Sequence, residues 1–228
     1  TTTYTDKKVK FGVPYYYKIQ TLNQSDGVTG YSGYSAVKSG KTTLTTKITS
    51  VVSRDSNTLE IKWNKIDEAY GYRILRSTSK KGSYKEIKTI KKPGTVKYQD
   101  KKAEAGKTYY YKVEILVKSG KKILENGVSK AVSGKTLKQV SITSVTANGT
   151  AMLLKWKKVS GADGYEIFRI TTKKGTYEQI GTVTGAKKTK YEDKTVSNGK
   201  TYYYKVRAYH KKKKLTETGS FSKIQKTY

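Results

Sequence analysis

Apolar and polar residues alternate along most of this chain. Leu59, Ile61 and Trp63, for example, are separated by Glu60 and Lys62. Successive side chains of a strand point to opposite faces, so this period of two predicts strands that each bury one face. The abundant Tyr, Thr, Val and Ile also favour strands, and no segment carries an amphipathic helical stripe. We therefore expect an all-β protein.

The alternation also predicts which face of the tyrosine-rich segments is buried. The middle tyrosines of the triple-Tyr runs, Tyr16, Tyr110 and Tyr203, should face away from the core, as should Lys205, Arg207 and Tyr209. The residues between them should face inward: Tyr109, Tyr111, Val113 and Ile115 in one copy, and Tyr202, Tyr204, Val206 and Ala208 in another.

These segments recur at a long, nearly constant spacing. The triple-Tyr runs begin at Tyr15, Tyr109 and Tyr202, which are 94 and 93 residues apart, and Trp63 and Trp156 are also 93 apart. Such a period indicates tandem domains, each with its own core. We predict a partial first unit at 1–43, which holds only the last three strands, and complete second and third units at 44–137 and 138–228.

Turn residues divide each complete unit into about seven short strands, which predicts a two-sheet antiparallel sandwich. The segments 39–43 and 133–138 are the expected linkers. Both are too short for a flexible tether, so neighbouring units should sit end to end with limited bending.

The order of motifs in each complete unit resembles that of fibronectin type III domains, particularly the bacterial tandem versions. A Trp on the second strand is followed by Gly-Tyr-x-Ile, then Tyr-x-Asp, a Gly-Lys-Thr turn and Tyr-x-Tyr-x-Val. The resemblance implies tandem immunoglobulin-like antiparallel β-sandwiches with Trp63 and Trp156 in their cores. It also implies that Tyr109 and Tyr202 form tyrosine corners, with each hydroxyl bonded to nearby backbone. The chain has no Arg-Gly-Asp tripeptide, so integrin binding is not carried over.

The first unit poses a physical problem, because three strands alone would expose a wide apolar face. Three interpretations remain open. The sequence is a stretch of a longer protein whose preceding strands complete the unit, a separate subunit donates those strands, or the remnant is a folded cap against the next unit.

The net charge of +31 is spread along the chain and is carried mostly by lysine. The first unit has six basic and two acidic residues, the second 22 and nine, and the third 20 and six. Lysine acts as a hydrated point charge, whereas arginine supplies the bidentate contacts of sequence-specific nucleic-acid binding. The pattern favours loose attraction to polyanions such as anionic cell-wall polymers or glycans, with nucleic acid bound only non-specifically.

Residues suited to catalysis are scarce. The only histidine, His210, lies beside four lysines in the expected last hairpin loop, where we interpret it as solvated. The acidic residues near turns, including Asp100 and Asp193, are interpreted as turn caps that offset lysines. There is no cysteine, phosphate-binding loop or calcium-loop motif, so we expect no catalytic centre, cofactor or metal site.

The outward-facing aromatic and basic residues are weak binding candidates. Tyr110 and Tyr203 could stack on sugars, although their recurrence favours packing over lysine stems. Lys211, Lys212, Lys213 and Lys214 form the densest charge cluster, which we interpret first as a solvated hairpin tip and second as a contact for an acidic polymer.

These observations predict a non-catalytic spacer or assembly and adhesion module of a bacterial extracellular or cell-surface protein. Its partners would be other domains of a longer chain or neighbouring subunits. The alternative is an accessory, weakly glycan-binding region of a secreted polysaccharide-degrading enzyme. No run of residues is apolar and long enough to span a membrane.

Overall fold

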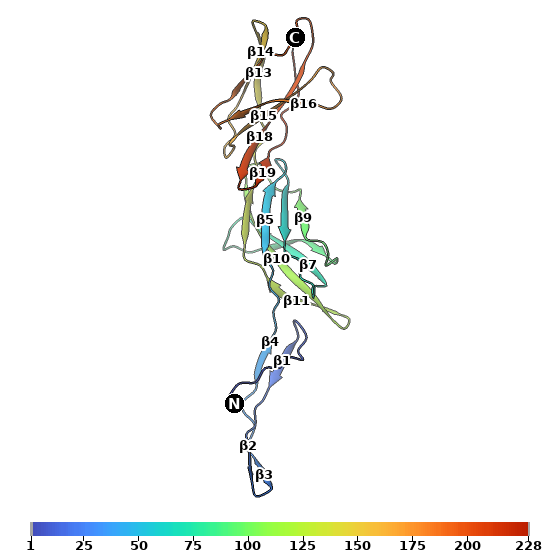
Figure 1. Ribbon diagram of the computed structural model, residues 1–228, viewed down its shortest axis with the longest axis vertical. Helices are drawn as coiled ribbons and strands as arrows, with labels where there is room; N and C mark the ends of the chain where they lie inside the picture. The colour runs from blue at the N-terminus through green and yellow to red at the C-terminus, as the bar shows by residue number, and fades with distance from the viewer. Residues whose placement is uncertain (1, 228) are drawn as a thin grey trace.

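The computed structural model describes residues 2–227, and these residues form twenty β-strands and no helix. The units follow one another along a single long axis, with the third unit at the C-terminal end (Figure 1). The strand-only structure of the described residues confirms the all-β prediction.

The first unit consists of two small antiparallel pairs. Strand β1 (Pro14–Tyr17) pairs with β4 (Lys38–Lys41), and β2 (Leu22–Ser25) pairs with β3 (Val28–Tyr31). Figure 1 shows the β2–β3 hairpin at the far end of the molecule.

The second unit is a sandwich of two antiparallel sheets. One sheet has the order β5-β6-β9, with β5 (Ile48–Ser53), β6 (Leu59–Trp63) and β9 (Lys97–Asp100). The other has the order β11-β10-β7-β8, and a fifth strand also pairs with β10. Its strands are β7 (Gly71–Ser77), β8 (Lys85–Ile90), β10 (Thr108–Ser119), β11 (Lys122–Val128) and β12 (Val132–Lys135).

The third unit repeats this topology strand for strand. Its smaller sheet has the order β13-β14-β17, and its larger sheet has the order β16-β15-β18-β19, with β20 also paired to β18. The smaller sheet contains β13 (Ile142–Asn148), β14 (Ala151–Trp156) and β17 (Lys190–Asp193). The larger contains β15 (Gly164–Ile170), β16 (Glu178–Thr184), β18 (Tyr203–Lys212), β19 (Leu215–Thr218) and β20 (Gln225–Lys226).

Each complete unit has its own core, built from the expected inward rows. The predicted core aromatics are all at most 4% exposed: Trp63, Trp156, Tyr109, Tyr111, Tyr202 and Tyr204. In each core the tryptophan packs edge-on against a tyrosine of the opposite sheet. The ring centroids are 5.4 Å apart for Trp63 with Tyr72 and 5.2 Å apart for Trp156 with Tyr165.

The last strand of each complete unit is split in two, which gives eight strands where about seven were expected. In the second unit Ser129 lies between β11 and β12, and its hydroxyl oxygen accepts a 2.9 Å hydrogen bond from the amide of Val113. Ser222 does the same for Val206 in the third unit, at 3.1 Å. A side chain therefore replaces one backbone acceptor of the ladder, and each complete unit has eight strands.

Two details differ from the expectations. Tyr209 lies on the face opposite the core row, as predicted, but it is only 4% exposed. Its ring lies over Gly164, the residue opposite it on β15, where a Cβ atom would come within 2.6 Å of the Tyr209 hydroxyl. The expected linkers 39–43 and 133–138 begin inside β4 and β12, so the true connections start only after Lys41 and Lys135.

Candidate functional site: the junctions between units

A tyrosine corner closes the entry to the tyrosine-rich strand in all three units. The hydroxyl oxygen of Tyr109 accepts a hydrogen bond from the amide of Glu104 at 3.3 Å. Tyr202 accepts one from Ser197 at 2.9 Å. In the first unit Tyr15 accepts one from Lys10 at 3.0 Å. Each bond spans five residues, so the first unit retains the local geometry of the complete ones.

A buried carboxylate ties the two sheets of each complete unit together. Asp193 is 1% exposed and accepts hydrogen bonds from Tyr204 at 2.8 Å and from Arg169 at 2.7 Å. Burial opposes its ionisation, but the bonds from Thr195, Tyr204 and Arg169 outweigh this cost and lower the pKa of Asp193. Burial next to the carboxylate raises the pKa of the Tyr204 hydroxyl, which therefore stays protonated as a donor.

The second unit contains the same cluster. Asp100 is 2% exposed and accepts hydrogen bonds from Tyr111 at 2.8 Å and from Arg76 at 2.8 Å. Asp100 and Asp193 do cap the turn that follows them, through the amides of Lys102 and Thr195 at 3.0 Å. The expectation that they offset lysines was wrong, because their charge partners are arginines.

The second and third units meet at a junction with direct hydrogen bonds. The amide of Ser56 donates to the hydroxyl of Ser220, and the amide of Ser220 donates to the hydroxyl of Ser56, both at 3.0 Å. The Ser53 hydroxyl donates to the Thr218 carbonyl at 3.0 Å, and the Thr218 hydroxyl donates to the Arg54 carbonyl at 2.9 Å. The segment after β5 is thus joined to the end of β19, as their proximity in Figure 1 shows.

The connecting segment is itself held in this junction. Leu137 is 4% exposed and belongs to the core of the third unit. Gly219 lies against it, and a Cβ atom there would be only 2.9 Å from the Lys138 carbonyl oxygen and 3.3 Å from the Leu137 Cβ. The Gln139 side chain also donates to the Phe221 carbonyl at 2.6 Å. The connection is therefore packed rather than loose.

The junction between the first and second units uses residues 126–127, which lie 93 residues before residues 219–220 of the other junction. Asn126 on β11 accepts a hydrogen bond from the amide of Leu44 and donates one to the carbonyl of Thr42 at 3.1 Å. Gly127 packs against the same segment, and a Cβ atom there would overlap the Leu44 carbonyl oxygen at 1.6 Å. One amide side chain thus binds both sides of the connection.

The candidate aromatics are parts of mixed clusters on the outer face of the larger sheets. Tyr110 and Tyr203 are both half-buried. The amino group of Lys112 lies 4.3 Å from the ring centre of Tyr84, and that of Lys205 lies 4.0 Å from the ring centre of Tyr177. The outer face therefore combines tyrosine rings with lysine stems, in both complete units.

The four lysines at the end of the chain's last long hairpin remain exposed, as expected. Lys211 and Lys212 end β18, and Lys213 adopts the left-handed conformation, with φ of 56°, in the turn that follows. His210 is a correction: it lies within β18, half-buried, with its Nδ1 atom 3.1 Å from a carboxylate oxygen of Asp163. Strand pairing and this acidic neighbour hold it away from the loop tip.

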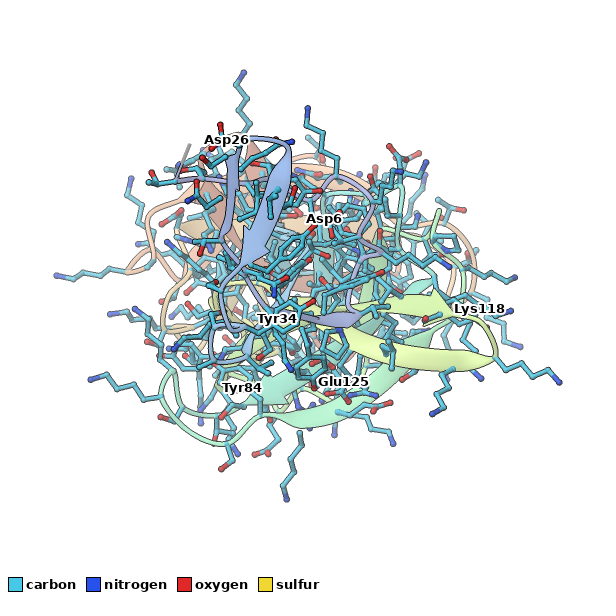
Figure 2. All side chains as sticks on the ribbon, turned by 90° about the horizontal axis from the view of Figure 1, so that it is seen from below. Asp6, Asp26, Tyr34, Tyr84, Lys118 and Glu125 are labelled. Carbon is cyan, nitrogen blue, oxygen red and sulfur yellow. The ribbon has the colours of Figure 1, made fainter. Side chains whose placement is uncertain are left out.

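Long side chains tipped with nitrogen project outward all around the axis (Figure 2). Within residues 2–227 no three histidine or acidic side chains gather closely enough to hold a metal ion. No helix in the same range has the length and apolar character needed to cross a membrane.

Sequence reasoning missed the residues that make the junctions and the arginines of the buried clusters. Arg76 and Arg169 carried a usable signal, because they are 93 residues apart in a chain with few arginines. Ser56, Ser220 and Asn126 carried none, since polar residues of these types are common at any surface turn.

The two-sheet topology, the core tryptophans and the tyrosine corners define a tandem of fibronectin type III folds, as the motif order predicted. No protein-family model matches the chain. Among solved structures, it resembles the FN1–FN3 domains of chicken CNTN1 with a TM-score of 0.50 and 14% identity, covering 93% of this chain and 76% of that one. A two-domain fibronectin type III segment of chicken tenascin aligns with 19% identity over 78% of this chain and 97% of that one, at a TM-score of 0.34.

One curated protein is similar in sequence. An amylopullulanase of Thermoanaerobacterium saccharolyticum is 39% identical over 75 residues, which are 32% of this chain and 6% of that enzyme. The match thus spans a small fraction of the enzyme's length.

Proposed function

We propose that this chain is a non-catalytic spacer and assembly module of a bacterial extracellular or cell-surface protein. The observation that carries the proposal is the junction in which Ser56 and Ser220 exchange hydrogen bonds at 3.0 Å. Together with the packed connection through Leu137, it restrains two sandwiches in series. A restrained series of units sets the distance between whatever is attached to its ends.

Small-angle X-ray scattering of the chain tests this function. A spacer should give a long particle whose maximum dimension is the same at every protein concentration. The Ser56→Ala/Ser220→Ala double variant should broaden the distance distribution, and Ser79→Ala/Ser83→Ala, in the exposed turn between β7 and β8, is the matched control. A compact particle, or identical profiles for the two double variants, would argue against the proposal.

A second candidate is an accessory region of a secreted polysaccharide-degrading enzyme. It is favoured by the amylopullulanase match and by the outer clusters around Tyr110 and Tyr203. Affinity electrophoresis in gels containing soluble polysaccharides, pullulan among them, should then show retardation. The Tyr110→Ala/Tyr203→Ala variant should lose it, and Tyr31→Ala, which changes an exposed tyrosine of the first unit, should keep it. Equal migration with and without polysaccharide would exclude this function.

Attraction to anionic cell-wall polymers or glycans is the interaction expected from a charge of +31. Screening over about 8 Å at physiological ionic strength makes such binding salt-sensitive. Binding to a teichoic-acid-type polymer should therefore fall as salt is added, and Lys211–Lys214 should contribute without being required.

A further inference from the structure

The third unit has an open groove of about 760 Å³ at one edge of its sandwich. The groove lies beside the end of β14, the end of β16 and the loop that leads into β17. Its lining consists of Lys155, Lys187, Lys188 and Lys190 with Thr143, Thr189, Val183 and Trp156. None of these described residues is acidic, so the groove attracts anions.

Two of the groove lysines repel each other across the smaller sheet. Lys155 on β14 and Lys190 on β17 are directly opposite in the antiparallel register, and both are exposed. Like charges at such positions destabilise a sheet. Glu192 lies two residues further along β17, but it pairs with Lys194 at 3.5 Å and accepts a hydrogen bond from Asn148 at 2.6 Å. Within residues 2–227 none of the four groove lysines forms a salt bridge.

The second unit has the same lysine pair but neutralises it. Lys62 is opposite Lys97, and the amino group of Lys62 lies 3.7 Å from a carboxylate oxygen of Glu60. Glu60 is 7% exposed and is also bound by Arg54, so its position is fixed. At the position of Glu60 the third unit has Leu153. The third unit therefore lacks the internal counterion that the second unit supplies.

The turn before the edge strand adds further charge in the third unit alone. At an offset of 93 residues, Lys187 and Lys188 take the places of Gly94 and Thr95. Each turn is closed by a 3.0 Å backbone hydrogen bond, from the amide of Thr95 in one unit and of Lys188 in the other. The same turn thus carries two more lysines in the third unit, beside the unneutralised pair.

A hydrogen-bond donor without an acceptor lies at the same place. Trp156 lines the groove and is 4% exposed, and its indole Nε1 atom has no acceptor within residues 2–227. Burying an unsatisfied donor is costly, and an anionic oxygen in the groove would satisfy it. The Nε1 atom of Trp63 is also unsatisfied, so the lysines distinguish the third unit.

We propose that this groove is a binding site for a flexible polymer of phosphodiesters, such as a polyol phosphate chain. The choice of polymer rests on the proposed function at the bacterial surface. Four lysines carry more charge than one phosphodiester balances, which favours a chain with several phosphates. Lysine binds phosphate as a point charge, and arginine, which would impose bidentate geometry, is absent from the described lining. Sugars and bases could not stack here, because the one aromatic ring is 4% exposed.

Binding would remove the repulsion within the lysine pair. One phosphate between Lys155 and Lys190 would supply the counterion that Glu60 supplies in the second unit. Lys187 and Lys188 would hold the next phosphate of the chain. A ligand that binds only the folded state stabilises it, so the polymer should raise the unfolding temperature of the third unit.

Calorimetric titration of the whole chain with poly(glycerol phosphate) tests the site. Lys187→Gln/Lys188→Gln should weaken binding about 10-fold and reduce the slope of log affinity against log salt by about two. The matched control Lys213→Gln/Lys214→Gln removes the same charge from the densest lysine cluster and should weaken binding by less than about twofold. Equal losses would show that only net charge matters, which overturns the groove but not the general attraction to polyanions.

Tryptophan fluorescence reports contact with the polymer separately from affinity. The chain has two tryptophans, so Trp63→Phe leaves Trp156 as the reporter and Trp156→Phe leaves Trp63. The polymer should shift or quench the emission of Trp156 and leave that of Trp63 unchanged. Equal changes at both, or no change at Trp156, would overturn the proposal. The lysine variants alter neither core, so they decide the matter if a tryptophan variant does not fold.

Other polymers test other occupants of the groove. Single-stranded DNA, dextran sulfate or phosphatidylglycerol vesicles could bind more tightly than poly(glycerol phosphate) at matched charge, with the loss confined to Lys187→Gln/Lys188→Gln. That result would assign the groove to a nucleic acid, a sulfated glycan or a membrane and overturn the proposal. Scattering keeps the spacer function separate: a long particle that binds no polymer refutes the groove alone, and a compact particle that binds it refutes only the spacer.

Discussion

Ser56 and Ser220 are 164 residues apart in sequence and yet bind each other twice, each donating its amide to the hydroxyl of the other at 3.0 Å. Because each serine is both donor and acceptor, the pair fixes distance and direction together. The nearby bond from Ser53 to the Thr218 carbonyl gives the junction a second attachment point.

Removing the serine pair should loosen the junction without unfolding the units. In Ser56→Ala/Ser220→Ala both backbone amides lose a side-chain acceptor at a partly exposed site, which should cost about 1 kcal/mol per bond. Spin labels on Lys88 and Lys173, one in each complete unit, should report a broader distance distribution. An unchanged distribution would mean that the packed connection alone sets the geometry.

The sandwich core of the third unit should depend strongly on its tryptophan. Trp156→Ala removes a 4% exposed ring and should lower the free energy of unfolding by roughly 3–5 kcal/mol. Its neighbour Lys155 is exposed, so Lys155→Ala should change the free energy by no more than about 0.5 kcal/mol. Urea denaturation measures both, and similar losses would contradict the observed strand phase.

The buried hydroxyl of Tyr204 should contribute more to stability than the hydroxyl of its neighbour Tyr203. Tyr204→Phe leaves Asp193 without its 2.8 Å donor, which should cost about 1–3 kcal/mol. Tyr203→Phe removes a hydroxyl from the half-buried outer face and should be nearly neutral. The comparison requires only equilibrium unfolding, and a neutral Tyr204→Phe would show that the bonds from Arg169 and Thr195 suffice for the carboxylate.

The lowered pKa of Asp193 predicts acid sensitivity of the third unit. A carboxylate with a folded-state pKa below its ordinary value, about 3.9, stabilises the fold at pH values above that value. The contribution is lost as the pH falls from about 4 through the lowered pKa. Unfolding of the parent and of Asp193→Asn between pH 7 and pH 2 should show a difference that is largest near neutrality and shrinks in acid. A difference independent of pH would contradict this account.

The first junction should be sensitive to a single methyl group. Gly127→Ala places a Cβ atom 1.6 Å from the Leu44 carbonyl oxygen, so the connection must move and the Asn126 bonds must break. Gly94→Ala has nothing within 4 Å and is the matched control. Limited proteolysis should cleave the Gly127→Ala variant near residues 42–44 much faster than the control. Equal cleavage rates would show that the contact does not restrain the connection.

The sequence predicted the sandwiches because their cores depend on local alternation. Trp63, Ile61 and Leu59 must point one way on a strand, whatever lies elsewhere in the chain. The phase is right at Tyr209, but its burial was not foreseen, because the outward ring packs over Gly164 across the ladder, a neighbour that only strand pairing reveals. The junctions were not predictable in detail, since Ser56 and Ser220 meet only after both units have folded. Asp100 was misinterpreted for the same reason, because its arginine partner comes from the other sheet.

The position of the paired serines bears on how the molecule would respond to a pull along its length. The chain enters and leaves each complete sandwich at opposite ends (Figure 1), so tension would reach the serine bonds together with the cores. The few hydrogen bonds of this junction are far weaker than a sandwich interior. They would therefore separate before either sandwich unfolds and re-form when the load is removed, so the junction would extend reversibly under tension.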